Sequence, residues 1–525
     1  MAKTKRKILV LDGVNQICAR HLRKAGLLVK ESSDTEDIDL GQWDGVIIRS
    51  KTKLKAKAIQ QAAKGRLRLI IRAGAGVDTI DVDAATRNGV IIENTPGTNA
   101  AAVIELTMAA LVAMARSLIP AHISVKQGLW EKKKFAGTEL RGKTLGVIGV
   151  GKIGRGVATL AQGFGMRVLG ADPMLTVERA KELSIEPANI ARICKESDYI
   201  TLHASLTEQS KAILGRKQFA SMKKGVCIAN CARAELVDRD ALLDALNSGK
   251  VKYYFTDVFE QEPPPADDPL LQHKSVLATP HVGGATEESS IEGARMAAEQ
   301  AAAFFNEDRI VNAVNFAPGD PQLRPWEVLA ERLGSFAYQY ATDGAFKTIT
   351  VEYVGKIASR DTNRVTASFF AGFMRNVRSS VNIVNAKQMA AETGIDVTEA
   401  KSAGEHDQMR INVTMSNRSI TLSGTCVLGR PVLQALNDYS FDIPLEDRHI
   451  LISEHSDVPG IVGIIGTALG RHNINIEKMG LKDIVGRPSM AIITTREETP
   501  DAVVREIAVG VKKRGGDILL RKINL

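Results

Sequence analysis

Three polar residues that could carry out proton and carboxylate chemistry each follow a separate apolar run in the middle of the chain. Arg233 lies in NCARAELVD, Glu262 in DVFEQEP and His281 in TPHVGGAT. The runs before them are typical of parallel strands, whose carboxyl ends form the ligand-binding edge of an open α/β sheet. We therefore expect the three side chains to converge on one pocket.

Together these residues could oxidise a 2-hydroxy acid. His281 is the candidate base, because an imidazole can accept the proton of an alcohol while hydride leaves the same carbon. Glu262 would hold the imidazole and raise its pKa by stabilising the imidazolium. Arg233 would orient the substrate through paired hydrogen bonds and polarise the developing carbonyl. A lone histidine or glutamate in a turn is more often structural, so this prediction depends on all three occurring together.

A glycine-rich turn indicates the hydride acceptor. Residues 149–154 read GVGKIG, follow the β-prone run TLGVIG and open a helix-compatible stretch. Gly149, Gly151 and Gly154 would permit a tight turn and the close approach of a pyrophosphate at a helix N-terminus. Asp172 ends the next strand, where a carboxylate accepts hydrogen bonds from the adenosine ribose and disfavours a 2′-phosphate. The pattern predicts NAD, rather than NADP, as the cofactor.

The elements around these motifs form two α/β series. Strand-like runs at residues 7–11, 45–50 and 67–74 alternate with helical stretches, and a second series starts at residue 142. Between the two series, residues 99–118 predict one long apolar helix that is buried on most faces. After the histidine turn, Thr286 is a plausible N-cap for another long helix.

The composition changes near residues 315–327, where three prolines and a glycine mark a linker. Residues 328–445 then mix helices with alternating β-runs. Residues 448–525 read strand, helix, strand, strand, helix, strand, which is the order of a ferredoxin-like unit. The predicted fold class is α/β, with two doubly wound parallel sheets of Rossmann and flavodoxin-like type, followed by an α+β domain and the ferredoxin-like unit.

Length and composition narrow the class of protein. A chain of 525 residues suggests three or four domains. No apolar run is long enough to span a membrane, and the N-terminus passes from a short basic segment into a strand, so we expect a cytoplasmic protein without a membrane partner. Five cysteines without a CxxC pair indicate reduced thiols and no metal site. The net charge of +9 comes without a recognisable nucleic-acid module, so it favours an anionic metabolite over nucleic acid.

The motifs closely resemble those of the D-isomer-specific 2-hydroxyacid dehydrogenases. The matching stretches follow the family order from residue 72 to residue 286: RAGAGVDTID, NTPGTNAAAVIELT, ELRGKTLGVIGVGKIG, NCARAELVD, DVFEQEP and TPHVGGAT. The resemblance implies the arginine, glutamate and histidine roles given above, and it places Asp257 opposite the nicotinamide carboxamide. It implies NAD contacts at Lys152, Ile153, Asp172, Cys231, Ala232, Arg233, Asp257, His281, Gly283 and Gly284.

The resemblance also implies a nested organisation. Residues 1–97 and 281–316 would form the substrate-binding domain, and residues 98–280 the NAD-binding Rossmann domain. Residues 318–445 resemble the intervening regulatory domain, and residues 448–525 the ACT domain, of the long form within this family that oxidises D-3-phosphoglycerate. A homotetramer is the expected assembly.

The expected substrate-binding residues come from the first domain and from a neighbouring subunit. Arg49 and Arg72 each end an apolar strand and could bind a phosphate. The turn at Gly74, Ala75 and Gly76 can offer backbone N–H groups to the substrate carboxylate. Lys132 resembles the position from which a neighbouring subunit helps in this family.

The expected effector site lies in the C-terminal domain. In the family, L-serine binds between paired ACT domains, and the matching residues are His455, Asp457 and Asn475. The family often has asparagine where Asp457 stands. A carboxylate there would repel the carboxylate of serine, so L-serine is a possible effector only.

Three functional interpretations remain open. The first is NAD-dependent oxidation of D-3-phosphoglycerate to 3-phosphohydroxypyruvate, the first step of L-serine biosynthesis. The second is a glyoxylate/hydroxypyruvate reductase, or another 2-hydroxyacid dehydrogenase, with an acquired regulatory tail. The third is a catalytically silent NAD-sensing protein, supported by Ala234-Glu235 in place of the usual glycine pair. If either glycine normally takes a positive φ, the backbone beside Arg233 would differ here.

Overall fold

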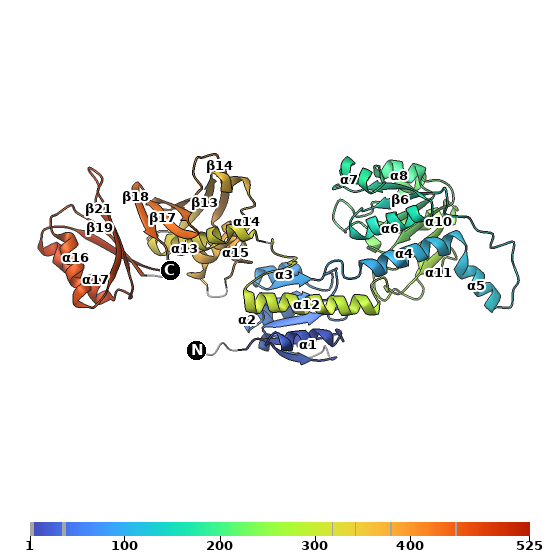
Figure 1. Cartoon of the computed structure of the whole chain (residues 1–525), viewed down its shortest axis with the longest axis horizontal. Coiled ribbons are helices and arrows are strands. Elements are labelled where there is room, and N and C mark those ends of the chain that lie inside the picture. Colours follow the sequence, from blue (N-terminus) through green and yellow to red (C-terminus); the bar gives the residue numbers. More distant parts are fainter. Residues whose placement is uncertain (1–4, 34–37, 318, 342, 379–380, 447–448) are drawn as a thin grey trace.

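The computed structural model describes residues 5–33, 38–317, 319–341, 343–378, 381–446 and 449–525. Within this part of the chain, two parallel sheets are followed by a mixed sheet and an antiparallel sheet, which confirms the predicted fold class. The predicted domain boundaries at residues 1, 318 and 448 lie outside the described residues. Figure 1 shows the first sheet at the lower centre, the second at the upper right and the two C-terminal sheets at the left.

The first sheet comprises β1 (Lys7–Val10), β2 (Leu28–Glu31), β3 (Gly45–Ile48), β4 (Leu69–Arg72) and β5 (Ile91–Asn94). Its helices are α1 (Ile17–Lys24), α2 (Ala56–Lys64), α3 (Val82–Arg87) and the distant α12 (Glu287–Glu307). The order β2-β1-β3-β4-β5 is flavodoxin-like. Helices α1 and α12 cover one face and α2 and α3 cover the other, so the strands are apolar on both faces. As predicted, Thr286 caps α12, and its Oγ1 accepts a hydrogen bond from the Ser289 N–H.

The second sheet comprises β6 (Thr144–Ile148), β7 (Arg167–Ala171), β8 (Glu186–Pro187), β9 (Tyr199–Leu202), β10 (Val226–Asn230), β11 (Val251–Thr256) and β12 (Val276–Ala278). Its helices are α4 (Ala100–Ala115), α5 (Leu118–Lys126), α6 (Lys152–Gly163), α7 (Val177–Glu182), α8 (Ile190–Glu196), α9 (Arg216–Ser221), α10 (Arg239–Asn247) and α11 (Pro269–Gln272). In the order β12-β11-β10-β9-β6-β7-β8, the strands after β6 are added first on one side of it, as β7 and β8, and then on the other side, from β9 to β12. The point between β6 and β9 is therefore a topological switch point. A Rossmann sheet binds its dinucleotide at this switch point.

The predicted apolar helix at residues 99–118 is confirmed as α4, which is mostly buried and differs from the prediction only at its ends. Helix α4 ends at Ala115, Ser117 takes a left-handed conformation with φ of 49°, and α5 then starts at an angle of 66° to α4. Pro120 explains the break, because it lacks the N–H that a continuous helix would need and fits only the first turn of a new one. Among the described residues no single helix is long and apolar enough to span a membrane, and only this bent pair taken together passes that test.

The third sheet follows α13 (Arg324–Tyr340) and has the order β14-β13-β15-β16-β17-β18. Its elements are β13 (Phe346–Val354), β14 (Asp396–Ser402), β15 (Gln408–Met415), β16 (Ser419–Val427), β17 (Arg430–Leu436), β18 (Tyr439–Pro444), α14 (Asn363–Arg375) and α15 (Ala386–Glu392). The fourth sheet contains β19 (His449–His455), β20 (Ile476–Lys482), β21 (Ser489–Thr495) and β22 (Ile518–Asn524), with α16 (Ile461–Arg471) and α17 (Asp501–Lys513). Its order β20-β21-β19-β22 is ferredoxin-like.

The third and fourth sheets share one hydrophobic core. Ile450, Ile452, Met490, Ile492 and Ile523 of the fourth sheet belong to the same buried cluster as α13 and the third sheet. Helices α16 and α17 cover the opposite face of the fourth sheet. The two C-terminal modules therefore form one packed body.

Candidate active site

The glycine turn after β6 has the geometry of a dinucleotide cradle. A Cβ at Gly149, whose φ is +91°, would lie 2.4 Å from the backbone nitrogen of Ala204, and a Cβ at Gly154 would lie 2.0 Å from the carbonyl oxygen of Gly149. Gly151 precedes α6 and has open space where its Cβ would be. Packing therefore requires the first and third glycines, whereas the second leaves room for a pyrophosphate at the helix N-terminus. These residues fit NAD.

The other residues expected to contact the cofactor surround this turn. Asp172 follows β7, and its carboxylate accepts 2.8 Å hydrogen bonds from the backbone N–H groups of Val150 and Met174, which fixes it beside the glycines. Lys152 Nζ donates to the carbonyl of Gly97, 2.9 Å away, and Ile153 is half-buried beneath the turn. Burial raises the pKa of the Cys231 thiol to about 12, so it stays neutral. Ala232, next to it, donates its N–H to the Asn230 side chain.

The carboxyl ends of β10, β11 and β12 bring the predicted catalytic residues to one edge of the second sheet. Arg233 follows β10, Glu262 follows β11 and His281 follows β12, and these three strands are adjacent. His281 Nδ1 lies 2.8 Å from both carboxylate oxygens of Glu262. A carboxylate can only accept, so this contact fixes the proton on Nδ1 and leaves Nε2 with a free lone pair.

The turn at His281 is held by a buried carboxylate. Asp257 is 1% exposed and accepts hydrogen bonds from Thr279 Oγ1 and from the backbone N–H groups of Val282 and Gly283. His281 itself has a φ of +52°, a strained conformation for a non-glycine residue. A Cβ at Gly283 would lie 2.8 Å from the Asp257 carboxylate. Asp257 and the glycine therefore orient the imidazole.

The backbone on either side of the site is shaped by Gly284 and by the Ala234-Glu235 pair. A Cβ at Gly284 would lie 2.9 Å from the amide of Asn99, at the start of α4, so this glycine permits close packing. Ala234 and Glu235 form a short 3-10 turn after Arg233, and neither has a positive φ. The backbone beside Arg233 therefore needs no glycine in this chain.

Positively charged side chains gather at the expected substrate turn after β4. Burial lowers the pKa of the Arg72 guanidinium, with Asp78 raising it and Arg233 and Arg49 lowering it further. A Cβ at Gly74 would lie 2.3 Å from Arg72 Nη1. Arg49 directly follows Ile48, which pairs with Arg72, and Arg233 Nη2 lies beside Gly76 of the same turn, so three guanidinium-bearing residues lie near one another where an anion could bind.

The turn itself can contribute backbone donors. Among the described residues the N–H groups of Ala75 and Gly76 donate to no backbone carbonyl, whereas the Gly74 N–H bonds to the carbonyl of Arg72. Two of the three expected donors are therefore available to a ligand. The third is used within the turn.

Two residues near the site were missed at the sequence level. Asp78 accepts a 2.9 Å hydrogen bond from Arg233 Nη2, and RAGAGVDTID contains it, but its partner lies 155 residues away. His203 follows β9 at the same sheet edge, and burial lowers its pKa to about 4. Its Nε2 has no hydrogen-bond partner among the described residues. Only its position after an apolar strand could have singled it out.

The remaining predicted residues do not join this site within one chain. Lys132 is exposed in the loop after α5, which extends away from the first sheet at the right of Figure 1. His455 ends β19 opposite Ser489, whereas Asn475 precedes β20 near His449, so the length of β19, about 20 Å, separates them. Asp457 lies in the turn beyond His455. Burial lowers the pKa of His455.

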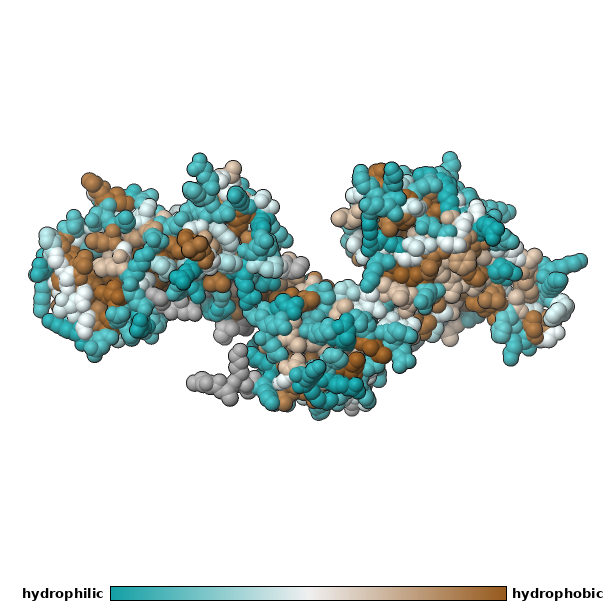
Figure 2. Space-filling model, in the orientation of Figure 1, coloured by the Kyte–Doolittle hydropathy of each residue, from teal (hydrophilic) through white to brown (hydrophobic). Residues whose placement is uncertain are grey.

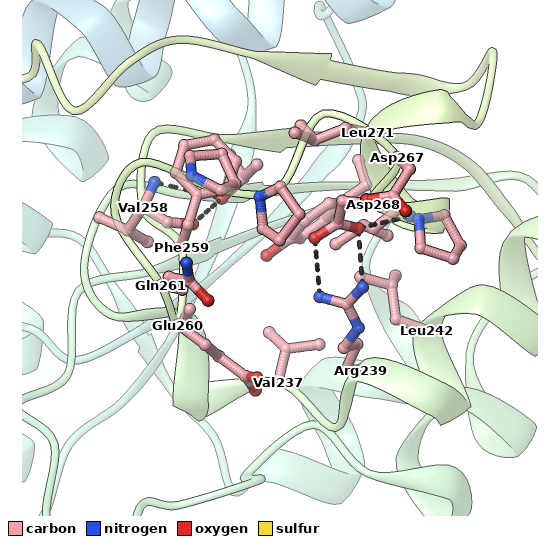
Figure 3. Close-up of a pocket in the computed structure, with 17 residues that line it drawn as sticks. Val237, Arg239, Leu242, Val258, Phe259, Glu260, Gln261, Asp267, Asp268 and Leu271 are labelled. Atoms are coloured by element: carbon pink, nitrogen blue, oxygen red, sulfur yellow. Dashed lines mark hydrogen bonds and ion pairs between the residues drawn. The ribbon is translucent and has the colours of Figure 1, made fainter.

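A cavity of about 400 Å³ lies beside the loop after β11 and is lined by none of the three predicted catalytic residues. Figure 3 shows Phe259 and Gln261 on one side and the paired Arg239 and Asp268 on the other. The cavity lies against α10 and α11, and the predicted catalytic side chains are not among those that line it.

Comparison with known proteins agrees with this geometry. Residues 108–283 match the model of the NAD-binding domain of the D-isomer-specific 2-hydroxyacid dehydrogenases, and residues 322–433 match the D-3-phosphoglycerate dehydrogenase intervening domain. The chain is 36% identical to D-3-phosphoglycerate dehydrogenase from Archaeoglobus fulgidus over 92% of each chain. It is 35% identical to the Homo sapiens enzyme over 88% of this chain and 90% of the other.

Solved structures of related dehydrogenases resemble about three fifths of the chain. A glyoxylate reductase from Paecilomyes thermophila is 28% identical, with a TM-score of 0.54 over 59% of this chain and 98% of the other. An NAD-dependent formate dehydrogenase from Staphylococcus aureus, solved with NAD, is 26% identical, with a TM-score of 0.53 over 60% of this chain and 100% of the other. The predicted family and the predicted cofactor NAD are confirmed. The chain belongs to the D-3-phosphoglycerate dehydrogenases, a branch of the NAD-dependent D-isomer-specific 2-hydroxyacid dehydrogenase family.

Proposed function

We propose that the protein oxidises D-3-phosphoglycerate to 3-phosphohydroxypyruvate with NAD, the first step of L-serine biosynthesis. The observation that carries the proposal is that Arg49, Arg72 and Arg233 lie around the expected substrate turn, which is contacted by Arg72 Nη1 and Arg233 Nη2, while Glu262 and His281 pair at the sheet edge that also carries Arg233. A monocarboxylate needs one guanidinium. A substrate with both a carboxylate and a phosphate can use all three.

The bound NAD would supply the hydride acceptor, held by Gly151, Lys152 and Asp172. His281 Nε2 accepts the proton of the substrate hydroxyl, since Glu262 keeps the other ring nitrogen protonated. The same carboxylate stabilises the imidazolium that forms. Arg233 binds the substrate carboxylate and its carbonyl oxygen as charge develops there.

Substrate selection follows from the first domain. We assign the phosphate to Arg49 and Arg72, and the carboxylate to Arg233 and the N–H groups of the 74–76 turn. Steady-state NADH formation tests the assignment with D-3-phosphoglycerate, D-glycerate and D-lactate. We expect strong preference for the phosphorylated substrate, and Arg72→Ala should remove most of that preference while leaving the activity on D-lactate within about threefold. Equal activity on all three substrates would refute the assignment and favour the broader reductase.

The silent, NAD-sensing interpretation has lost its support. It depended on a changed backbone at Ala234-Glu235, and both residues adopt ordinary negative φ values. The retained His281–Glu262 pair favours an active enzyme.

We also propose the domain roles given by the resemblance, including an ACT-type regulatory role for residues 448–525 and a homotetramer. Helix α5 and the loop after it expose Leu118, Ile123 and Trp130, the last 84% exposed, and Figure 2 shows hydrophobic side chains over this region at the right. A second copy would cover them. Trp130→Ser should shift the assembly toward smaller species in light scattering.

An L-serine site would also need a second copy, because one chain holds His455 and Asn475 at opposite ends of the fourth sheet. Inhibition of the tetramer by L-serine, absent from a dissociated variant, would support this site. All five cysteines are free thiols, which supports a cytoplasmic location.

A further inference from the structure

The carboxylate of Asp78 occupies the guanidinium that we assign to the substrate. Arg233 donates from Nη1 to the carbonyl of Ala232 and from Nη2 to Asp78 Oδ2, 2.9 Å away. A Cβ at Gly76 would lie 2.3 Å from Arg233 Nη2 and 2.7 Å from Asp78 Oδ2. The ion pair therefore lies against the turn that carries the free backbone donors. An acid of the protein itself stands where a substrate carboxylate is expected.

Two acidic residues, Asp12 and Asp78, lie near Arg72, and Asp78 differs from Asp12 in its contacts. Asp12 is fully used in structure, because its oxygens accept hydrogen bonds from the Arg49 N–H, the Thr52 N–H and the Thr52 hydroxyl. The Asp78 side chain is 68% exposed and its partner Arg233 is 32% exposed. Asp78 can therefore leave Arg233 for water without breaking any other side-chain bond that the structure records for it.

The pair also joins the two N-terminal domains. Asp78 belongs to the first sheet and its loops, and Arg233 belongs to the second. It is an exposed ion pair, so water competes for both groups and its strength is modest.

We propose that Asp78 is an affinity-setting residue that acts as an internal competitor for the carboxylate of every ligand at Arg233. This inference rests on the proposed function. Any ligand carboxylate must first displace Asp78, so each ligand loses the same free energy and the ratios between substrates are unchanged. Binding of the product is weakened by the same factor, which favours its release.

Asp78→Asn tests the proposal, because asparagine keeps the shape but loses the charge. We expect KM for D-3-phosphoglycerate and for D-lactate to fall by the same factor, about two- to fivefold, the effect of about 0.4–1 kcal/mol for an exposed ion pair. Asp78→Glu should restore the original values. Asp83→Asn is the matched control, because Asp83 is an exposed acid on α3 in the same domain. It should leave KM unchanged.

A binding measurement separates this proposal from the proposed function. Oxalate titrated calorimetrically into the full-length enzyme with NADH should bind two- to fivefold more tightly to Asp78→Asn than to the control. The oxalate comparison tests Asp78 even if the wild-type enzyme fails to oxidise D-3-phosphoglycerate. Such a failure would refute the assigned substrate but not the role of Asp78. A merely structural role predicts weaker binding in Asp78→Asn. Equal or weaker oxalate binding in Asp78→Asn would overturn the inference.

Discussion

Replacing Glu93 with glutamine should stabilise the protein at neutral pH and remove part of its pH dependence. Glu93 lies in β5 and is fully buried. Its Oε1 accepts a 2.8 Å hydrogen bond from the Val311 N–H, and its Oε2 has no partner among the described residues. Burial raises the pKa of this carboxyl group from 4.5 to about 8, against smaller opposing effects of Val311 and Arg309. The folded protein therefore holds a proton on Glu93 that the unfolded chain releases.

The sign and size of the effect follow from linkage. Below pH 4.5 both states are protonated and Glu93 has no pH-dependent effect. Between pH 4.5 and 8 the folded state binds more protons, so the free energy of unfolding falls as pH rises, by ~1.4 kcal/mol per pH unit. At pH 7 the loss is at most about 3 kcal/mol. Glu93→Gln keeps the acceptor for Val311 but cannot ionise, so it regains that stability.

Unfolding should be followed locally, because a chain of several domains does not unfold in one step. Hydrogen exchange of β5 and residues 309–315, measured between pH 5 and pH 8 and corrected for the intrinsic exchange rate, reports the free energy of opening. The difference between Glu93→Gln and wild type should grow with pH, while Asp83→Asn in the same domain should follow wild type. Parallel pH profiles for Glu93→Gln and wild type would refute the argument.

The remaining predictions concern catalysis and the cofactor. Glu262→Gln should lower kcat roughly 10²- to 10⁴-fold without changing NAD affinity. The amide can donate a hydrogen bond to Nδ1 of His281, which leaves the ring proton on Nε2, where the base must be free. A loss in steady-state kcat of less than tenfold would argue against His281 as the base. Asp172→Ala should weaken NAD binding about 10- to 100-fold, because the hydrogen bonds expected from the adenosine ribose would be lost. It should also reduce the preference for NAD over NADP. NADH and NADPH fluorescence titrations measure both, and an unchanged preference would contradict the role of Asp172.

Much of the site could be predicted because its residues follow strands. The positions of Arg233, Glu262 and His281 depend only on strand order and direction, which alternating α/β patterns specify. The dinucleotide turn is equally local, since the three glycines and Asp172 lie within one βαβ unit.

Features that depend on long-range placement could not be predicted. The Arg233–Asp78 pair joins two domains, and no local pattern records how those domains meet. Nothing in the sequence around Asp257 indicates that its carboxylate accepts three hydrogen bonds from the turn that contains His281.

The common core of the third and fourth sheets bears on how this chain can be shortened. If the last module were cut away alone, the apolar side chains of α13 and the third sheet that share a core with Ile450 and Ile523 would face water, so a fragment ending near residue 445 should aggregate. A cut before Pro321 removes both modules together and leaves the core of the second sheet intact, although it also takes away Val384, which packs against the core of the first sheet. The modules of the third and fourth sheets can therefore be kept or removed only together.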